Sequence, residues 1–124
     1  LSALQAHLPD ESFIYLGDTA RLPYGTKSPA TIVRYAEQAA DRLMTRGIKL
    51  LVIACNTASS IGMPILQDEF PELPIVGVLE PSAEAACAAT QSGHIAVIAT
   101  QATVTSDGYQ KAIRRLRPEA CVRA

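Results

Sequence analysis

The feature that most constrains the fold of this chain is an unbroken apolar run at residues 50–54 that leads directly into Cys55. Because no polar residue alternates along the run, it predicts a parallel strand that helices cover on both faces. Small polar residues follow the cysteine, and apolar residues then recur at helical spacing. The sequence therefore predicts that Cys55 lies between the carboxyl end of a strand and the start of a helix, where open α/β sheets bind ligands.

The rest of the chain alternates between segments with strand and helix patterns. The predicted strands are residues 12–17, 50–54, 74–79 and 94–100, with a further strand opening at 121–122. Five helices are predicted, at residues 1–8, at 27–47, from Cys55 to about 70, from 82 to about 90 and at 103–116. Ser28 is expected to cap the second helix and Ser82 the fourth, and Pro64 is expected to kink the third. In the last helix we expect Tyr109, Ile113 and Leu116 to face inward.

This alternation predicts the α/β class, with a parallel sheet, flanking helices and right-handed crossovers. A break at residues 91–93 divides the chain into a first α/β domain, 1–92, and the start of a second, 93–124. Three strand ends then carry polar loops to the same edge of the fold. These are residues 18–25, 55–60 and 100–103, and their convergence indicates a site.

Composition and charge exclude several classes of function. The chain has 124 residues and a net charge of −1 with no basic stripe, which argues against nucleic acid and against a membrane surface as partners. No apolar run approaches about 18 residues and the start lacks a signal-peptide pattern, so we expect no membrane span. The three cysteines form no CxxC pair, which fits reduced thiols in the cytoplasm and argues against structural zinc.

The sequence contains no nucleotide-binding, serine-hydrolase or zincin motif, and no lysine ends a strand to hold a Schiff-base cofactor. His7 and His94 are badly placed to pair with Cys55 as a base. A buried structural cysteine is the alternative interpretation of Cys55. The neighbouring Asn56 and Thr57 favour a functional one, because the start of a helix favours the thiolate and small hydrogen-bond donors suit a carboxylate or amino acid.

Four blocks of the sequence stand out: YLGDTARLPYG at 15–25, VIACNTAS at 52–59, VGVLEP at 76–81 and IATQATV at 98–104. In this order and spacing, they together resemble glutamate racemase, in the aspartate/glutamate racemase superfamily. The resemblance implies a cofactor-independent, two-domain enzyme that interconverts L- and D-glutamate between two cysteines and supplies D-glutamate for peptidoglycan, hence for the cell wall and cell shape. It implies Cys55 as the first catalytic cysteine and the following substrate-binding residues: Tyr24, Gly25, Asn56, Thr57, Thr100 and Thr103.

The chain also departs from that family. The family's first strand, with its Asp-Ser motif, and the block that carries its second cysteine have no counterpart here, and neither Cys87 nor Cys121 replaces that cysteine. We therefore expect a fragment with an incomplete first domain, inactive alone. Its uncovered apolar edges favour self-association, so a homodimer is one expected state. Two alternatives stay open: an aspartate- or hydantoin-type racemase, and a truncated module that binds a ligand without catalysis.

Overall fold

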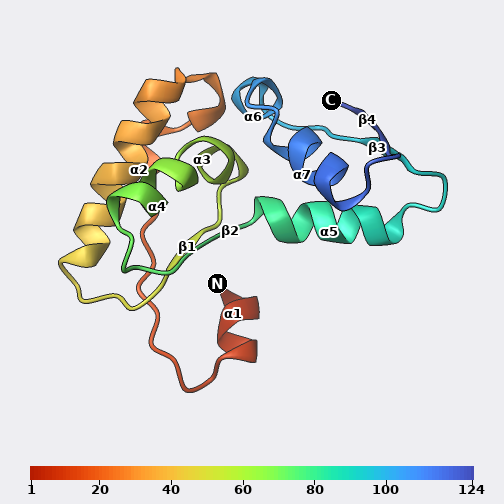
Figure 1. Cartoon of the computed structure of the whole chain (residues 1–124). Helices are drawn as coiled ribbons and strands as arrows, with labels where there is room; N and C mark the ends of the chain where they lie inside the picture. The colour runs from red at the N-terminus through yellow and green to blue at the C-terminus, as the bar shows by residue number, and fades with distance from the viewer.

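The structure, a computed structural model, describes all of residues 1–124 and has two small parallel sheets, each flanked by helices (Figure 1). The four strands are β1 (Leu51–Ile53), β2 (Ile75–Gly77), β3 (His94–Ala96) and β4 (Cys121–Arg123). The α-helices are α1 (Ser2–His7), α2 (Pro29–Met44), α3 (Asn56–Ile61), α4 (Met63–Glu69), α5 (Leu79–Ala89), α6 (Gln101–Thr105) and α7 (Gly108–Leu116). Two short 3₁₀ turns, η1 (Thr19–Arg21) and η2 (Tyr24–Thr26), precede α2. The predicted α/β class with parallel strands is confirmed.

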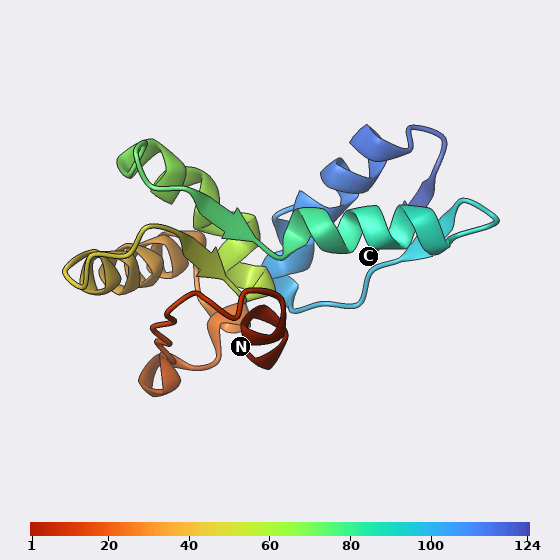
Figure 2. The ribbon, with the colours of Figure 1, turned by 90° about the horizontal axis from the view of Figure 1, so that it is seen from below.

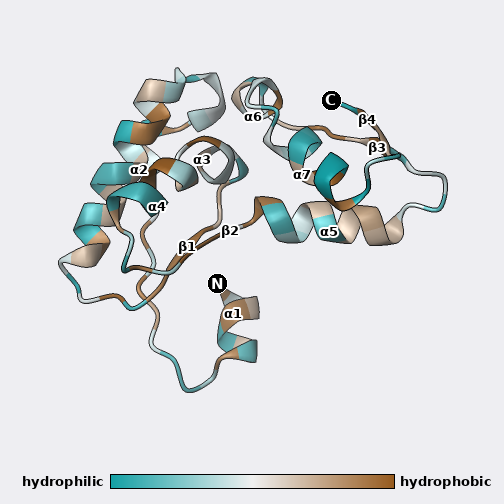
Figure 3. Cartoon of the chain, in the orientation of Figure 1, coloured by the Kyte–Doolittle hydropathy of each residue, from teal (hydrophilic) through white to brown (hydrophobic).

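The first sheet pairs β1 with β2 and buries only one of its faces. Leu51 and Ile75, which are register partners, are buried in a core with residues of α2 and α4. The next pair, Val52 and Val76, points to the opposite face, where the two side chains are 36% and 46% exposed. Figure 3 shows that both strands are apolar along their length. The prediction that helices cover both faces is therefore wrong for this chain.

The second sheet pairs β3 with β4, and its core includes a helix that follows directly from the first sheet. Leu79 and Ala83 of α5 pack against Ala112 and Ile113 of α7, with Ile95 and Val122 of the sheet beside them. Figure 2 shows α5 running on from the end of β2 toward the second sheet. The two cores are thus joined through α5, and the predicted division into residues 1–92 and 93–124 stays a prediction.

Several helix boundaries follow the predicted signals. Ser28 caps α2, its hydroxyl accepting the N–H of Thr31 at 3.3 Å, and Pro29 occupies the first turn, where a missing N–H costs nothing. The kink expected at Pro64 is present as a break at Gly62 between α3 and α4. A Cβ at Gly62 would lie 3.0 Å from Ala36, which shows how closely the break packs on α2.

The predicted strand at residues 12–17 is wrong. This segment has no regular structure and is largely exposed, because β1 pairs with β2 alone and leaves the segment no partner. A lone extended segment has no ladder to satisfy its backbone N–H and C=O groups. The predicted strand 94–100 is likewise shorter than expected, since β3 ends at Ala96, whose register partner is Arg123 of β4.

Two helix predictions also need correction. Ser82 does not cap α5, which begins at Leu79; its hydroxyl instead donates to the carbonyl of Val78 at 2.7 Å. Proline is tolerated in a first turn, so the helix starts ahead of Pro81. The single helix expected at 103–116 is two helices, separated where Asp107 adopts a left-handed φ of 59°. Ile113 is buried, whereas Leu116 is 42% exposed.

The uncovered face of the first sheet predicts concentration-dependent association of the isolated chain. Replacing Val52 and Val76 with threonine should shift the chain toward monomer while changing the free energy of unfolding by less than about 1 kcal/mol per site, because both side chains are already partly exposed. Sedimentation equilibrium and urea unfolding measure the two effects. The matched control, Leu51→Ala on the buried face, should instead cost about 2–5 kcal/mol. A wild-type chain that stays monomeric at high concentration contradicts this prediction.

Candidate functional site

Cys55 lies at the strand–helix junction that the sequence predicts. It is the N-cap residue of α3, its carbonyl accepts the N–H of Ser59 at 2.8 Å, and its side chain is exposed. The buried Ser59 fixes this junction, since its hydroxyl donates to the carbonyl of Ile53 at 2.8 Å and accepts the N–H of Val78 at 3.3 Å. The cysteine is therefore held at the end of β1 by a hydroxyl that also ties down the end of β2.

Three threonine hydroxyls meet beside this junction and form a closed triangle. Thr57 of α3 lies 2.9 Å from the hydroxyls of both Thr100 and Thr103, which are 3.0 Å from each other. Thr100 also caps α6, where it accepts the N–H of Thr103. A hydroxyl carries one proton and can accept two, so a triangle satisfies all three protons without a ligand. Thr57 and Thr103 are 3% and 1% exposed, as such a satisfied cluster allows.

The predicted Pro-Tyr-Gly turn reaches the same place through its glycine. Gly25 in η2 is buried, and a Cβ built on it would lie 2.3 Å from the Cβ of Thr100. Real side chains do not approach that closely, so only a residue without a Cβ brings this backbone against the threonine triangle. All three predicted loops therefore converge, as the sequence indicates.

Tyr24 points its phenol toward Asp18. The phenol donates to the Asp18 carboxylate at 2.5 Å, while Arg21 lies 3.6 Å from the same carboxylate. Burial is the largest of the effects that raise the pKa of Tyr24 well above the ordinary value of 10.0. The hydrogen bond to Asp18 and the negative charge of that carboxylate raise this pKa further, as does the charge of a Cys55 thiolate. The positive charge of Arg21 lowers it. Tyr24 thus stays a protonated donor, and Arg21 stacks on the neighbouring Tyr35 ring at 4.6 Å.

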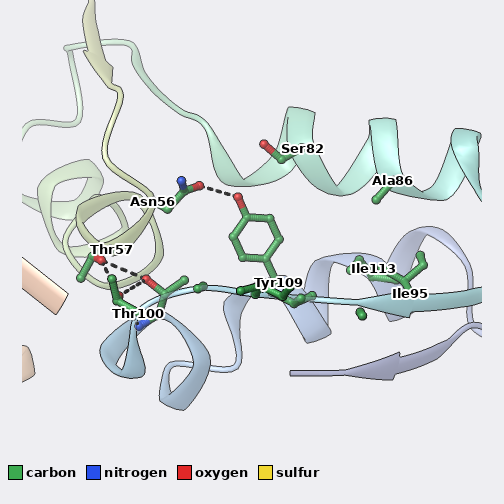
Figure 4. A pocket seen from close by; sticks show the side chains of 13 residues that line it. Asn56, Thr57, Ser82, Ala86, Ile95, Thr100, Tyr109 and Ile113 are labelled. Carbon is green, nitrogen blue, oxygen red and sulfur yellow. Dashed lines mark hydrogen bonds between the residues drawn. The ribbon is translucent and has the colours of Figure 1, made fainter. Parts of the chain in front are cut away.

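Asn56 follows the cysteine and contacts a residue from the far end of the chain. Its carboxamide oxygen accepts the hydroxyl of Tyr109, on α7, at 2.5 Å (Figure 4). Both residues line a cavity of about 350 Å³ that is polar at the Thr57 and Thr100 end and apolar along β3 and α5.

The predicted site residues are thus divided between two cavities. Asn56, Thr57, Thr100 and Thr103 line the first, whereas Gly25 lines a second cavity of about 530 Å³ on the other side of α6. Cys55 and Tyr24 line neither. No group of three or more His, Cys, Asp or Glu side chains is arranged to hold a metal ion, and no helix combines the length and apolar composition needed to cross a bilayer.

Sequence reasoning missed two contacts of the site. The role of Asp18 as the acceptor for Tyr24 was signalled only by its place in the first loop. Tyr109 was expected to face inward, but nothing in the sequence indicated that it would reach Asn56 across 53 residues. Both are long-range or turn-dependent contacts, which a local pattern does not encode.

The threonine triangle predicts a measurable loss on removal of one hydroxyl. Thr103→Val keeps the approximate shape and removes two of the three hydrogen bonds of the triangle, so the free energy of unfolding should fall by about 1–3 kcal/mol. Urea unfolding measures it. Thr26→Val, at an exposed position with only a 3.4 Å contact, is the matched control and should change little. Equal stability of Thr103→Val and wild type would contradict the closed triangle.

The Tyr24 environment predicts an unusual alkaline titration. Because the folded-state pKa lies above the unfolded one, its contribution to stability is complete below about pH 10 and is lost as the pH rises beyond it. In an ultraviolet titration, one of the four tyrosines should resist ionisation; Tyr24→Phe should remove that resistant signal, and Asp18→Asn should lower its midpoint. Tyr15→Phe, at a 76% exposed residue, is the control and should leave the resistant signal in place. The absence of any resistant signal in the wild-type chain would contradict this prediction.

Comparison with known proteins identifies relatives along nearly all of the chain. It is 54% identical over 112 residues to a glutamate racemase of Geobacter metallireducens, covering 90% of this chain and 41% of that protein. Against a glutamate racemase of Aquifex aeolicus it is 44% identical over 124 residues, covering 100% of this chain and 48% of the relative. The chain therefore spans less than half the length of these relatives.

Solved structures agree with the sequence relatives. Glutamate racemase from Aquifex pyrophilus superimposes with a TM-score of 0.93 at 38% identity, covering 99% of this chain and 48% of that one. The Francisella tularensis glutamate racemase in complex with D-glutamate superimposes with a TM-score of 0.87 at 39% identity, covering 96% and 44%. The family model described as Asp/Glu/Hydantoin racemase matches residues 1–123. With the family model, the sequence relatives and the solved structures in agreement, this chain belongs to the Asp/Glu/hydantoin racemase family.

Proposed function

We propose that a protein containing this chain, together with the segments that its relatives have beyond it, interconverts L- and D-glutamate by proton transfer between two cysteines. The observation that carries the proposal is the exposed Cys55 at the end of β1, followed by Asn56 and Thr57, in a chain 54% identical to a glutamate racemase. Cys55 is the proposed catalytic thiol of this chain. Tyr24, Gly25, Asn56, Thr57, Thr100 and Thr103 are its proposed substrate contacts.

The chemistry explains why a thiol suits this position. Inversion at an α-carbon needs a base that removes a weakly acidic proton from one face and an acid that returns one to the other. A free thiol has a pKa near 8.5, which is close enough to neutral pH for a cysteine to reach either protonation state. Negative charge grows on the substrate carboxylate as the proton leaves, and donors aimed at that carboxylate stabilise it where it develops. The carboxamide of Asn56 and nearby hydroxyls are donors of this kind.

The threonine triangle constrains how those hydroxyls take part. Since its three protons are satisfied among themselves, a carboxylate that accepts from one of them must break one side of the triangle. The amide N–H groups of Asn56 carry no such cost, since Tyr109 engages only the carboxamide oxygen. We therefore propose that Asn56 provides the initial recognition and that Thr100, which is less buried than its two partners, is the first hydroxyl to rearrange.

The identity of the relatives favours glutamate over the other substrates in the family description, aspartate and hydantoins. We further propose that the protein acts in the bacterial cytoplasm, where D-glutamate enters peptidoglycan and so supports the cell wall and cell shape. We also propose that the protein forms a homodimer and that its first domain ends at residue 92. For the isolated chain, a ligand-binding role without turnover is the alternative, because the chain spans only 41–48% of the relatives' length.

A chimera tests the proposed function directly. This chain replaces the matching 112-residue region of the Geobacter metallireducens relative, and the purified chimera is assayed for racemisation of each glutamate enantiomer. We expect turnover, and we expect Cys55→Ser to reduce it by at least about 100-fold, because a serine hydroxyl is a far weaker acid than a thiol. In D₂O, exchange at the α-carbon should survive from one enantiomer only, since the second thiol still faces one side.

Two controls accompany this measurement. Cys87→Ser, on α5 and half-buried, should keep racemisation near the wild-type rate, because the thiol lies against the carbonyl of Ile113 in the second core. The 124-residue chain alone should bind D-glutamate without racemising it. Equal rates for Cys55→Ser and wild-type chimeras, or racemisation by the isolated chain that survives Cys55→Ser, would overturn the role assigned to Cys55.

A further inference from the structure

We propose that Tyr109 is a positioning residue that fixes the carboxamide of Asn56 with its N–H groups turned toward the ligand. This inference deepens the proposed function, on which it rests for the nature of the ligand, a carboxylate. It assigns a role to a side chain from α7, outside the four sequence blocks that carry the resemblance.

The contact itself determines which end of the carboxamide is free. The hydroxyl of Tyr109 donates to the carboxamide oxygen of Asn56 at 2.5 Å, which is shorter than an ordinary hydrogen bond. An amide oxygen only accepts and an amide nitrogen only donates. With its oxygen engaged by Tyr109, Asn56 therefore presents its two N–H groups on the side away from the tyrosine.

This orientation matters because a carboxylate accepts hydrogen bonds and cannot donate them. A freely rotating asparagine would spend part of its time with the carboxamide oxygen facing the ligand, where two acceptors repel each other. Holding the amide in one orientation before the ligand arrives removes the cost of ordering it on binding. Tyr109 and Asn56 line the same cavity, and Figure 4 shows the phenol of Tyr109 reaching across it to the Asn56 oxygen.

The start of α7 is built to deliver the Tyr109 ring. A Cβ on Gly108 would lie 2.8 Å from Leu79 and 3.2 Å from Ser60, so the helix begins in tight contact with both α5 and α3. One turn further on, Ala112 and Ile113 are 5% and 1% exposed in the second core. The phenol is thus placed by packing, and its position is independent of any ligand.

The chain offers an unusually clean test, because Asn56 is its only asparagine. Labelling the 124-residue protein with ¹⁵N-asparagine gives one side-chain amide pair. In Tyr109→Phe, which keeps the ring and removes the hydroxyl, we expect that pair to shift and its two protons to exchange with solvent differently. Tyr15→Phe, at an exposed site, is the matched control and should leave the pair unchanged. An unchanged amide pair in Tyr109→Phe overturns the positioning role.

Binding of D-glutamate to the same proteins tests whether the orientation serves the ligand. Loss of one neutral hydrogen bond predicts a dissociation constant about three- to tenfold higher in Tyr109→Phe. In an Asn56→Ala background the same substitution should have no further effect, because Tyr109 would have nothing left to orient. A full additional loss in that background would show that Tyr109 acts on its own, and would overturn the proposal.

The two readouts also separate this inference from the proposed function. Absence of any D-glutamate binding by the wild-type chain would remove the ligand assigned to the site, and with it the purpose proposed for the orientation. The Asn56 amide pair would still show whether Tyr109 holds the carboxamide. Binding that weakens in Asn56→Ala but not in Tyr109→Phe would support the substrate contact and overturn the positioning role alone.

Discussion

The hydrogen bonds among Thr57, Thr100 and Thr103 are the interaction on which the arrangement of the site depends. Thr57 belongs to α3, which follows β1, whereas Thr100 caps α6 and Thr103 lies within it. Because two of the hydroxyls are almost fully buried, separating them would leave polar groups without partners in a place that water does not reach. The triangle therefore holds α3 against α6, and the Gly25 turn packs on its outer side. Cys55 and Asn56 take their positions from the helix that this contact fixes.

The fold could be predicted from sequence wherever a local signal set the structure. The strand before Cys55, the Ser28 cap and the break near Pro64 each depend on signals within one turn or strand, and these three predictions are confirmed. The errors arose where tertiary pairing decides. Residues 12–17 have a strand-like composition but no neighbouring strand to pair with, and composition alone carries no information about a partner. The break at Asp107 depends on a left-handed residue within an otherwise helical pattern.

The site shows the same division between local and distant information. Position relative to a strand end identified the loops at residues 55–60 and 100–103. The loop at 18–25 converges with them although the strand predicted before it is absent. The same reasoning could not show that the threonines would bond to one another, that Tyr24 would turn toward Asp18, or that Tyr109 would reach Asn56. Each of these depends on a side-chain direction set by packing, and the contact between Asn56 and Tyr109 joins α3 to α7 across 53 residues of the chain.

The direct passage from β2 into α5 has a mechanical consequence. Val78 alone separates the strand from the helix, yet β2 belongs to the first core and α5 to the second. The N–H of that residue is held by Ser59, which is itself bonded to the end of β1. A connection of one residue whose amide is hydrogen-bonded has little conformational freedom. A small rotation of the second core about Val78 is therefore transmitted to the start of α3 beside Cys55, because no flexible loop lies between them to absorb it.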